Sequence, residues 1–463
     1  MDQTTETIVN FAGQIASTTL AESTINHARR LLVDSLACMV GGFDGPPARI
    51  ARAMASEISS GFPASVAGNS AASSAELAAF ANTVAVRYLD FNDTFFSPLG
   101  GGGHPSDLIP TVLAVGDATA ASGHDALVAI VAAYEIWGKL AGTVRIRERG
   151  WDQGIFTEIA AAVATGLLLD LTPDQMAHAI SLAVIPNIPA RRTRAGALSM
   201  WKGCATAGAA RSGIFAAQMA SRGMTGPPEP FEGPEGIWDQ VTGPFSLDLA
   251  MPTCGSFVAE RTHLKSRPAE YNAQGPLDLI TALHGELSVE SIERIDVDTY
   301  WLCWSEIGHE PAKWDPKNRE TADHSLPYLM AVGLVDGRVD LDSFTDKRVQ
   351  DPALRPLMDA IHISERADLT AAFPREIGCR LHIKLAGGEV VNLETMSPRG
   401  HADNPLSDSE INAKFDLLTR NQPANVEVSR ELRDAGWNSD SLARISELTS
   451  LFGKLAGKTG SQA

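Results

Sequence analysis

The sequence has 463 residues, and 44% of them are hydrophobic and 20% are charged, a composition typical of a globular protein. A chain of this length is too long for one ordinary hydrophobic core, so two domains are expected. Its formal net charge of -18 argues against nucleic acid or an anionic membrane surface as a general partner. A small anionic substrate remains compatible with that charge, because a local pocket of Lys, Arg and His can be basic inside an acidic protein.

The cysteines and the apolar runs bear on the location of the protein. The five cysteines are scattered and form no CxxC pair, which fits reduced thiols in a cytoplasm. The N-terminal stretch MDQTTETIVNFAG has neither a basic start nor an apolar core, and no later stretch has the roughly 18 consecutive apolar residues of a membrane span. We therefore expect a cytoplasmic protein with no signal peptide and no membrane span.

The chain up to about residue 250 has a helical pattern, with Ala and Leu at three- and four-residue spacing. Residues 23–42 begin with a Ser/Thr cap and end in two glycines. In residues 171–185, Thr172 and Gln175 have the spacing of a capping box. A further helix over 205–223 ends in glycine. This part is predicted to be all-helical.

Within it, residues 89–107, LDFNDTFFSPLGGGGHPSD, crowd titratable side chains around four consecutive glycines. Glycine lets a backbone come close to a ligand, and a helix beginning at HPSD would offer free amide groups to an anion. A solvated loop explains the same residues. The pattern alone leaves both interpretations open.

The pattern changes beyond residue 260. Residues 292–301 alternate apolar and polar side chains, and residues 380–395 predict two strands joined through Gly387 and Gly388. A helical stretch over 325–337 lies between them. These features are typical of an α+β unit.

Helical signals return at the C-terminus. Ser407 and Glu410 have capping-box spacing, and residues 441–457 are amphipathic. We therefore predict a mainly α fold with an α+β lid. Its parts are a large discontinuous helical domain from residues 1–260 and 403–463, and a smaller inserted α+β domain from residues 261–402.

Known cofactor signatures are missing from the sequence. It contains no GxxxxGK[ST], no GxGxxG after a strand, no HExxH, no cysteine cluster with metal spacing and no GxSxG. Any chemistry would then depend on ordinary acids and bases, and we expect neither a metal nor a cofactor.

Four further stretches concentrate chemically useful residues: WDQGIFTE (151–158), RRTRAGALSMWKG (191–203), LKSRPAEYNAQ (264–274) and ETADHSLPY (320–328). Basic runs are usually solvated faces, and a single His or Tyr is usually a partly buried structural residue. Composition alone therefore does not show whether any of these stretches belongs to a functional site.

The order of the motifs is more specific than any one of them. LDFNDTF...GHPSD, SMWKG...GAARSG...RGMTGP, LKSRPAEYNAQ and ADHSLPY follow the order found in the MmgE/PrpD family, which includes 2-methylcitrate dehydratase, cis-aconitate decarboxylase and iminodisuccinate epimerase. The chain resembles this family over nearly its whole length. The resemblance implies a helical domain built from both chain ends, an α+β lid, a homodimer, and a cofactor-free active site between the domains.

Carried over residue by residue, the resemblance points to these site residues: Asp90, Thr94, His104, Lys202, Lys265, His324 and Tyr328. The family's common step is removal of a proton beside a carboxylate, and cations must hold the charge that develops. We assign Lys202 and Lys265 to that charge and to substrate carboxylates, with Arg191 or Arg192 as weaker candidates.

His104 is the first choice for general acid/base, because an imidazole titrates in the useful range. Asp90 would orient a ring or a hydroxyl, and Tyr328 with His324 would protonate the leaving group. His324 is an equal alternative for the base.

Two departures from the resemblance concern specificity. Asn272 stands in PAEYNAQ where dehydratase-like relatives tend to read PAEFHAQ, and Gln153 follows Asp152 where they often have His. An amide binds but does not shuttle protons. The glycine run 100–103 resembles an insertion between the DT and HPSD elements. These differences leave the identity of the substrate open.

We predict a cofactor-free lyase that adds water to, or removes it from, a hydroxylated di- or tricarboxylic acid of the 2-methylcitrate type. An isomerase, epimerase or decarboxylase on a related acid is the nearest alternative. A non-catalytic carboxylate-binding protein is a third, and the retained acids and bases argue against it.

Overall fold

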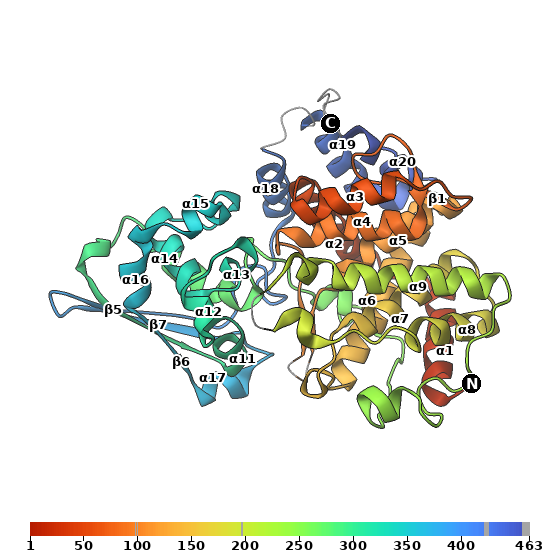
Figure 1. The fold of residues 1–463 in the computed structure, drawn as a ribbon, viewed down its shortest axis with the longest axis horizontal. Helices are drawn as coiled ribbons and strands as arrows, with labels where there is room; N and C mark the ends of the chain where they lie inside the picture. Colours follow the sequence, from red (N-terminus) through yellow and green to blue (C-terminus); the bar gives the residue numbers. More distant parts are fainter. Residues whose placement is uncertain (98, 100, 196–197, 421–425, 456–463) are drawn as a thin grey trace.

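The computed structural model describes residues 1–97, 99, 101–195, 198–420 and 426–455 (Figure 1). These residues form a mainly helical protein with one four-stranded mixed sheet and two short two-stranded ladders. The predicted role of Gly100 and the last two residues of the predicted amphipathic stretch, 456 and 457, lie outside the described residues.

The first part of the chain is helical, as the alanine periodicity predicts. Its helices are α1 (Gln3–Ser17), α2 (Glu22–Gly42), α3 (Pro46–Ser56), α4 (Ala75–Tyr88), α5 (Ile109–Thr119), α6 (Gly123–Thr143), α7 (Gly154–Leu168), α8 (Pro173–Val184) and α9 (Ala205–Ser221). Short ladders pair β1 (Pro63–Ala64) with β2 (Ser73–Ser74) and β3 (Phe95–Phe96) with β4 (Gly102–Gly103).

Small residues let these helices pack closely. A Cβ on Gly213 of α9 would lie 2.5 Å from the carbonyl oxygen of Glu158 on α7, so only glycine allows this approach. The capping box of α8 at Thr172 and Gln175 is present as predicted. The start of α2 differs: the helix begins at Glu22, and its N-cap is Ala21, which has no capping side chain, in place of the predicted Ser/Thr cap.

One helix needs comment because of its length. Of the helices in the described ranges, α6 is the one long and apolar enough to cross a membrane by length and composition, and 78% of its most apolar window is buried inside the protein. Most of its side chains contact the first hydrophobic core. This is the position of a core helix.

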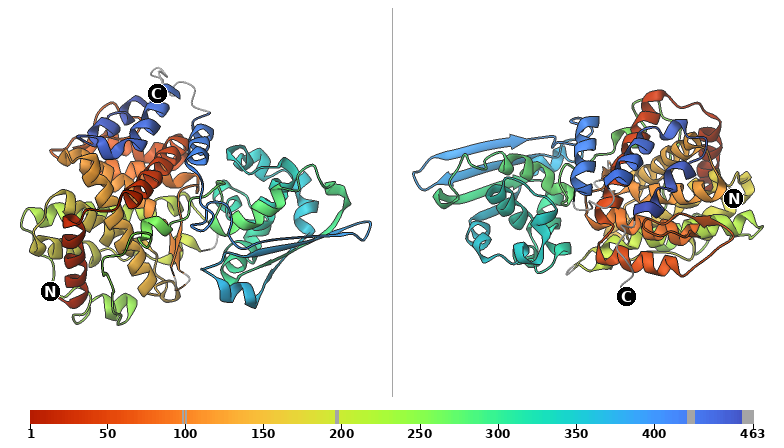
Figure 2. Two further views of the ribbon diagram at one scale, coloured as in Figure 1. Left: turned by 180° about the vertical axis from the view of Figure 1, so that it is seen from behind. Right: turned by 90° about the horizontal axis from the view of Figure 1, so that it is seen from above.

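The α+β region carries its own sheet. The strands β5 (Ile292–Thr299), β6 (Ile361–Glu365), β7 (Cys379–Leu385) and β8 (Val390–Thr395) lie in the order β6-β5-β7-β8, with β5 and β6 parallel and the other pairs antiparallel. The predicted hairpin is β7–β8, and Gly388 turns between the strands with φ +84°. The helices of this region gather on one face of the sheet (Figure 2).

The helices of this region are short apart from two, α10 (Gln274–Thr281) and α14 (Leu326–Asp336), which pack together beside the sheet. The others are α11 (Trp301–Cys303), α12 (Pro311–Trp314), α13 (Arg319–Ala322), α15 (Asp346–Val349), α16 (Arg355–Asp359) and α17 (Ala367–Ala372). α14 corresponds to the helix predicted over 325–337.

Two large hydrophobic cores account for most of the buried apolar residues in the described ranges. The first contains buried residues from 8–264 and again from 406–455, and the second contains Phe96 and residues 269–385. The C-terminal helices α18 (Asp408–Thr419), α19 (Val426–Trp437) and α20 (Ser446–Thr449) lie against the N-terminal helices (Figure 1). The capping box of α18 is present. The mainly helical class is confirmed, and the exact domain boundaries stay a prediction.

Candidate active site

A polar cavity of about 90 Å³ is lined by residues within 87–265 and by residues within 270–324 of the α+β region, and we call it the polar chamber. Nine of the eleven predicted site residues line it: Asp90, Thr94, His104, Gln153, Arg191, Lys202, Lys265, Asn272 and His324. Arg192 and Tyr328 do not. Of its lining residues, seven are Lys or Arg and five are Asp or Glu, so this chamber has an excess of positive charge in a strongly acidic protein.

The glycine-rich stretch forms one wall of the polar chamber. Gly102 and Gly103 are the strand β4, which pairs with Phe96 and Phe95. A Cβ on Gly103 would lie 1.4 Å from the end of the Gln153 side-chain amide. Glycine is therefore required for Gln153 to approach this strand.

The backbone amides at HPSD were considered as a site for an anion, but the amide of Ser106 is not free. The chain after His104 begins a 3-10 turn, η1 (Pro105–Leu108), and the backbone N–H of Ser106 donates to the buried Asp93 carboxylate (3.2 Å). Asp93 also accepts hydrogen bonds from the hydroxyls of Ser106 and Tyr134. The Ser106 amide is already bonded within the protein, so it is not free for a substrate.

His104 is held as a neutral base. Its Nδ1 lies 2.6 Å from the carbonyl oxygen of Asp93, so Nδ1–H donates there and Nε2 carries the lone pair. Burial, with the positive charges of Arg87 and Lys265, lowers the pKa of His104 well below its ordinary value. A neutral imidazole with a fixed tautomer is suited to accept a proton.

Asp90 is the centre of a buried ion cluster. It has φ 50°, at the C-terminal end of α4. The Lys265 Nζ lies 2.5 Å from Asp90 Oδ1, and the Lys202 Nζ lies 3.5 Å from Oδ2. Burial alone raises the pKa of Asp90, but Lys265 and Lys202 outweigh burial and hold it well below its usual range. The cluster thus keeps one carboxylate ionised between two ammonium groups.

His324 is oriented by a carboxylate. Its Nδ1 lies 2.7 Å from Asp323 Oδ1 and 3.4 Å from Asp90 Oδ2, while Ser325 caps α14 directly after it. Burial and Lys202 lower the pKa of His324, and Asp323 opposes them. His324 therefore differs from His104, because two carboxylates stabilise its protonated form.

Asp90, Asp323 and His324 could be considered as metal ligands, since their ligand atoms lie within 4.8 Å of one another. The Lys202 ammonium lies 3.1 Å from Asp323 Oδ1 and also contacts Asp90. A metal ion among these residues would lie beside that positive charge, and the carboxylates are already compensated. The donor set fits a lysine and not a metal.

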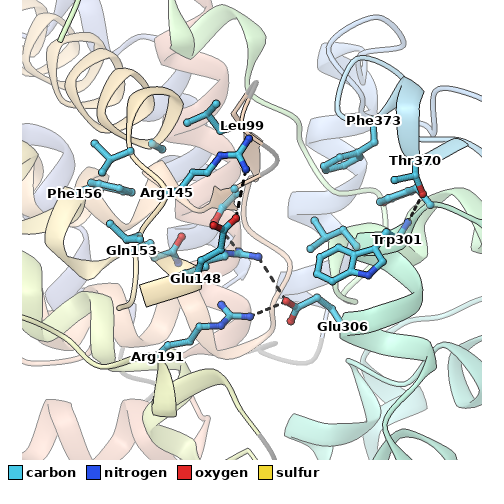
Figure 3. A pocket seen from close by; sticks show the side chains of 18 residues that line it. Leu99, Arg145, Glu148, Gln153, Phe156, Arg191, Trp301, Glu306, Thr370 and Phe373 are labelled. Atoms are coloured by element: carbon cyan, nitrogen blue, oxygen red, sulfur yellow. Dashed lines mark hydrogen bonds and ion pairs between the residues drawn. The ribbon is translucent and has the colours of Figure 1, made fainter. Parts of the chain in front are cut away.

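Arginines close another side of the chamber. Arg191, on the 3-10 turn η3 (Arg191–Arg194), donates to Glu306 of the α+β region at 2.7 Å, and the two side chains point toward each other across the cavity (Figure 3). Arg194 pairs with Asp152 at 2.6 Å. Arg192 faces a different surface hollow with Trp201. Of the two arginines offered as alternatives, Arg191 lines the chamber and Arg192 does not.

Tyr328 also lies away from the chamber. It is fully buried on α14, and its hydroxyl donates to the backbone carbonyl of Ser343. Burial raises its pKa above the ordinary value. The predicted leaving-group role of Tyr328 is not supported, because the helix turns this side chain into the second core while His324 precedes the helix.

Family models match most of the chain in two blocks. The MmgE/PrpD N-terminal domain matches residues 6–250, and the MmgE/PrpD C-terminal domain matches residues 268–435. The chain belongs to the MmgE/PrpD family. The second block extends past residue 402, the predicted end of the α+β domain.

Individual members of the family show the same relationship. The chain is 30% identical to a 2-methylcitrate dehydratase of Cupriavidus necator, over 70% of each chain. It is 29% identical to a 2-methylcitrate dehydratase of Escherichia coli (strain K12), over 76% of this chain and 78% of the relative. It is 24% identical to the cis-aconitate decarboxylase-like protein oryM of Aspergillus oryzae, over 97% of each chain.

The two amides predicted to affect specificity, Gln153 and Asn272, both lie in the chamber wall. In the orientation that satisfies both neighbours, Gln153 donates to the Gly102 carbonyl (3.0 Å) and accepts from Arg194 (3.2 Å). Asn272 accepts from the Tyr300 hydroxyl and donates to Glu270 (2.9 Å). Asn272 is buried, and both ends of its side-chain amide are bonded within the protein.

Among the chamber residues that were not predicted as site residues, Glu270 and Lys313 are the two with a shifted pKa that bear most on the chemistry. Glu270 lies in the LKSRPAEYNAQ stretch but was not chosen as a site residue. Burial raises the pKa of Glu270 to about 7. Lys313 on α12 is 3% exposed and lines the chamber. Unlike Lys202 and Lys265, it forms no ion pair with a described carboxylate, and burial lowers its pKa. No sequence motif marks Lys313.

Proposed function

We propose that the protein is a metal-independent hydro-lyase that removes water from a hydroxylated tricarboxylic or dicarboxylic acid of the 2-methylcitrate type. The observation that carries the proposal is the polar chamber, where buried lysines and two imidazoles with fixed tautomers converge. The names of the relatives support the same reaction class.

The proposed first step is proton removal beside a substrate carboxylate. His104 Nε2 takes the proton, and negative charge spreads onto the carboxylate as an enediolate. Lys202 and Lys265 lie where they would stabilise that charge, and preorganised cations in a water-poor site are effective at this task. Lys313 is not bound to a carboxylate of its own and is available to bind a substrate carboxylate.

The second step breaks the bond between carbon and the hydroxyl oxygen. The enediolate electrons form the carbon–carbon double bond, and the hydroxyl leaves as water with a proton from His324. Asp323 and Asp90 stabilise the protonated form of His324, so His324 is the more readily protonated of the two imidazoles and is the one suited to supply a proton. His104 then releases its proton to solvent, and His324 takes up a proton from solvent. Both imidazoles are thereby restored for the next cycle.

A decarboxylase is the second candidate, because the relative similar over 97% of this chain is named cis-aconitate decarboxylase-like. Both reactions need cations around a carboxylate, and an epimerase would use the same carbanion. These outcomes differ in whether water, carbon dioxide or neither is lost.

A panel of hydroxylated di- and tricarboxylic acids, incubated with the protein in deuterated water, separates these reactions. We expect loss of water from a 2-methylcitrate-type acid. Release of carbon dioxide would favour the decarboxylase, and deuterium exchange alone would favour the epimerase. No change in any acid would favour a carboxylate-binding protein and reject the hydro-lyase.

We also propose a homodimer, as the family resemblance implies. Light scattering during size-exclusion chromatography should give twice the mass of the 49.2 kDa chain. The mass of a monomer would reject the dimer.

A further inference from the structure

A second, larger cavity adjoins the polar chamber. Its volume is about 370 Å³, and we call it the apolar chamber (Figure 3). Six lining residues are shared by both cavities: Gly102, Arg147, Gln153, Arg191, Leu302 and Glu306. The two cavities therefore meet along a common boundary.

The walls beyond this boundary are mostly hydrocarbon. Ile146 and Phe156 come from the helical side and are buried in the first core. Leu302 and Phe373 come from the α+β side, opposite them. Trp301 is 54% exposed although it is a large apolar side chain. Such an apolar surface inside a cavity is costly to leave in water.

Five charged residues line the apolar chamber, and three of them, Arg147, Arg191 and Glu306, lie at the boundary. Arg145 and Glu148 pair with each other and are largely exposed to solvent. Arg147 and Arg191 both pair with Glu306 at the boundary, at 3.6 Å and 2.7 Å. An acid that crosses this boundary can thus keep its carboxylates beside the arginines on the polar side, while an apolar substituent extends past them.

We propose that the apolar chamber binds a hydrocarbon substituent of the substrate, so that the preferred substrate is a citrate-type acid with an alkyl chain longer than methyl. The chain would be attached to the carbon that loses its proton in the polar chamber. This inference rests on the proposed function and specifies its substrate class. A highly charged acid without such a chain would gain nothing from these walls, because their side chains offer it few partners.

The test is a series of 2-alkylcitrates with methyl, butyl and octyl chains, measured as kcat/KM for loss of water. Burying one methylene group favours binding by a factor of about four. We expect kcat/KM to rise with chain length by up to about that factor per methylene, until the chamber is filled.

Two variants probe the chamber walls in the same series. Val144 lines only the apolar chamber, so Val144→Phe should lower kcat/KM for the octyl acid at least tenfold and leave the methyl acid nearly unchanged. Trp301→Ala, a change at an exposed position, should lower kcat/KM for the octyl acid and not for the methyl acid. Trp304→Ala is its matched control, because Trp304 packs on His309 and lines neither chamber.

The outcomes separate the two hypotheses. Turnover of the methyl acid with no gain, or a loss, at longer chains overturns the alkyl-chain inference and leaves the hydro-lyase intact. An equal effect of Val144→Phe and Trp301→Ala on every chain length, with unchanged melting temperatures, also overturns it. No turnover of any acid in the series overturns the proposed function, and the inference with it.

Discussion

The polar chamber and the apolar chamber share a boundary but differ in how they are built. In the polar chamber, buried charges hold one another: Asp90 lies between Lys265 and Lys202, and Asp323 orients His324. In the apolar chamber, side chains such as Phe156 and Phe373 contribute an apolar surface and no charged group. If the polar chamber carries the reaction and the apolar chamber selects the substrate, mutations in the two chambers should affect turnover and chain-length preference separately.

The largest effect is expected for Lys265→Met. Removing a charge-stabilising group typically costs about 10²- to 10³-fold in turnover, and Lys202→Ala should lose a similar factor. Loss of Lys265 also leaves the buried Asp90 with one fewer partner, which costs about 3–5 kcal/mol in stability when a buried pair is broken. Turnover and the free energy of unfolding would be measured on the same preparation.

A double variant shows whether these two losses have different causes. Adding Asp90→Asn to Lys265→Met should restore much of the stability, because no charge is then left without its partner. Turnover should stay low. Unchanged kinetics in the single lysine variants would remove those lysines from the site.

Lys313→Met should have the next largest effect. Its ammonium has no carboxylate partner in the described chain, so a bound substrate would supply one. A hydrogen bond to a charged group contributes about 1.5–3 kcal/mol, which corresponds to about a tenfold to hundredfold loss in kcat/KM. The melting temperature should not fall, in contrast with Lys265→Met. A destabilised protein with normal kcat/KM would show that Lys313 is structural.

Gln153, at the boundary, and Asn272, in the wall of the polar chamber alone, should change specificity and not the reaction. Restoring histidine with Gln153→His and Asn272→His should shift the kcat/KM ratio toward 2-methylcitrate by about tenfold, since a site built for one hydrogen-bond pattern rejects another. The two single variants and the double variant would be compared on methylcitrate, citrate and the best acid from the panel. The same ranking and rates in all three would show that neither amide influences the substrate.

Glu270→Gln should give the smallest effect, seen as a pH dependence of stability. Burial raises the pKa of Glu270 from 4.5 to about 7, so between these values the folded state binds a proton that the unfolded state has released. Its contribution is complete below pH 4.5 and is lost as pH rises through 7. Wild type should therefore lose about 1 kcal/mol or more relative to Glu270→Gln over this range. A pH-independent difference in unfolding free energy would contradict the raised pKa.

The sequence could predict the helical class and most of the polar chamber for a physical reason. Alanine periodicity and capping residues act locally, and rare residue types in ordered motifs marked His104 and Lys202. Tyr328 was misplaced because its direction depends on how α14 packs. Lys313 was missed because a lysine beside prolines looks like solvated surface. The apolar chamber was missed as well, since Ile146 and Phe156 look like core residues until the opposing wall is known.

The most direct test of the central claim follows 2-methylcitrate by proton NMR in deuterated water, using protein treated with a chelator. We expect loss of water and formation of the double bond at the same rate as without chelator, and loss of this activity in folded His104→Gln. Deuterium exchange without loss of water, activity that requires an added divalent metal ion, or full activity in His104→Gln would contradict it.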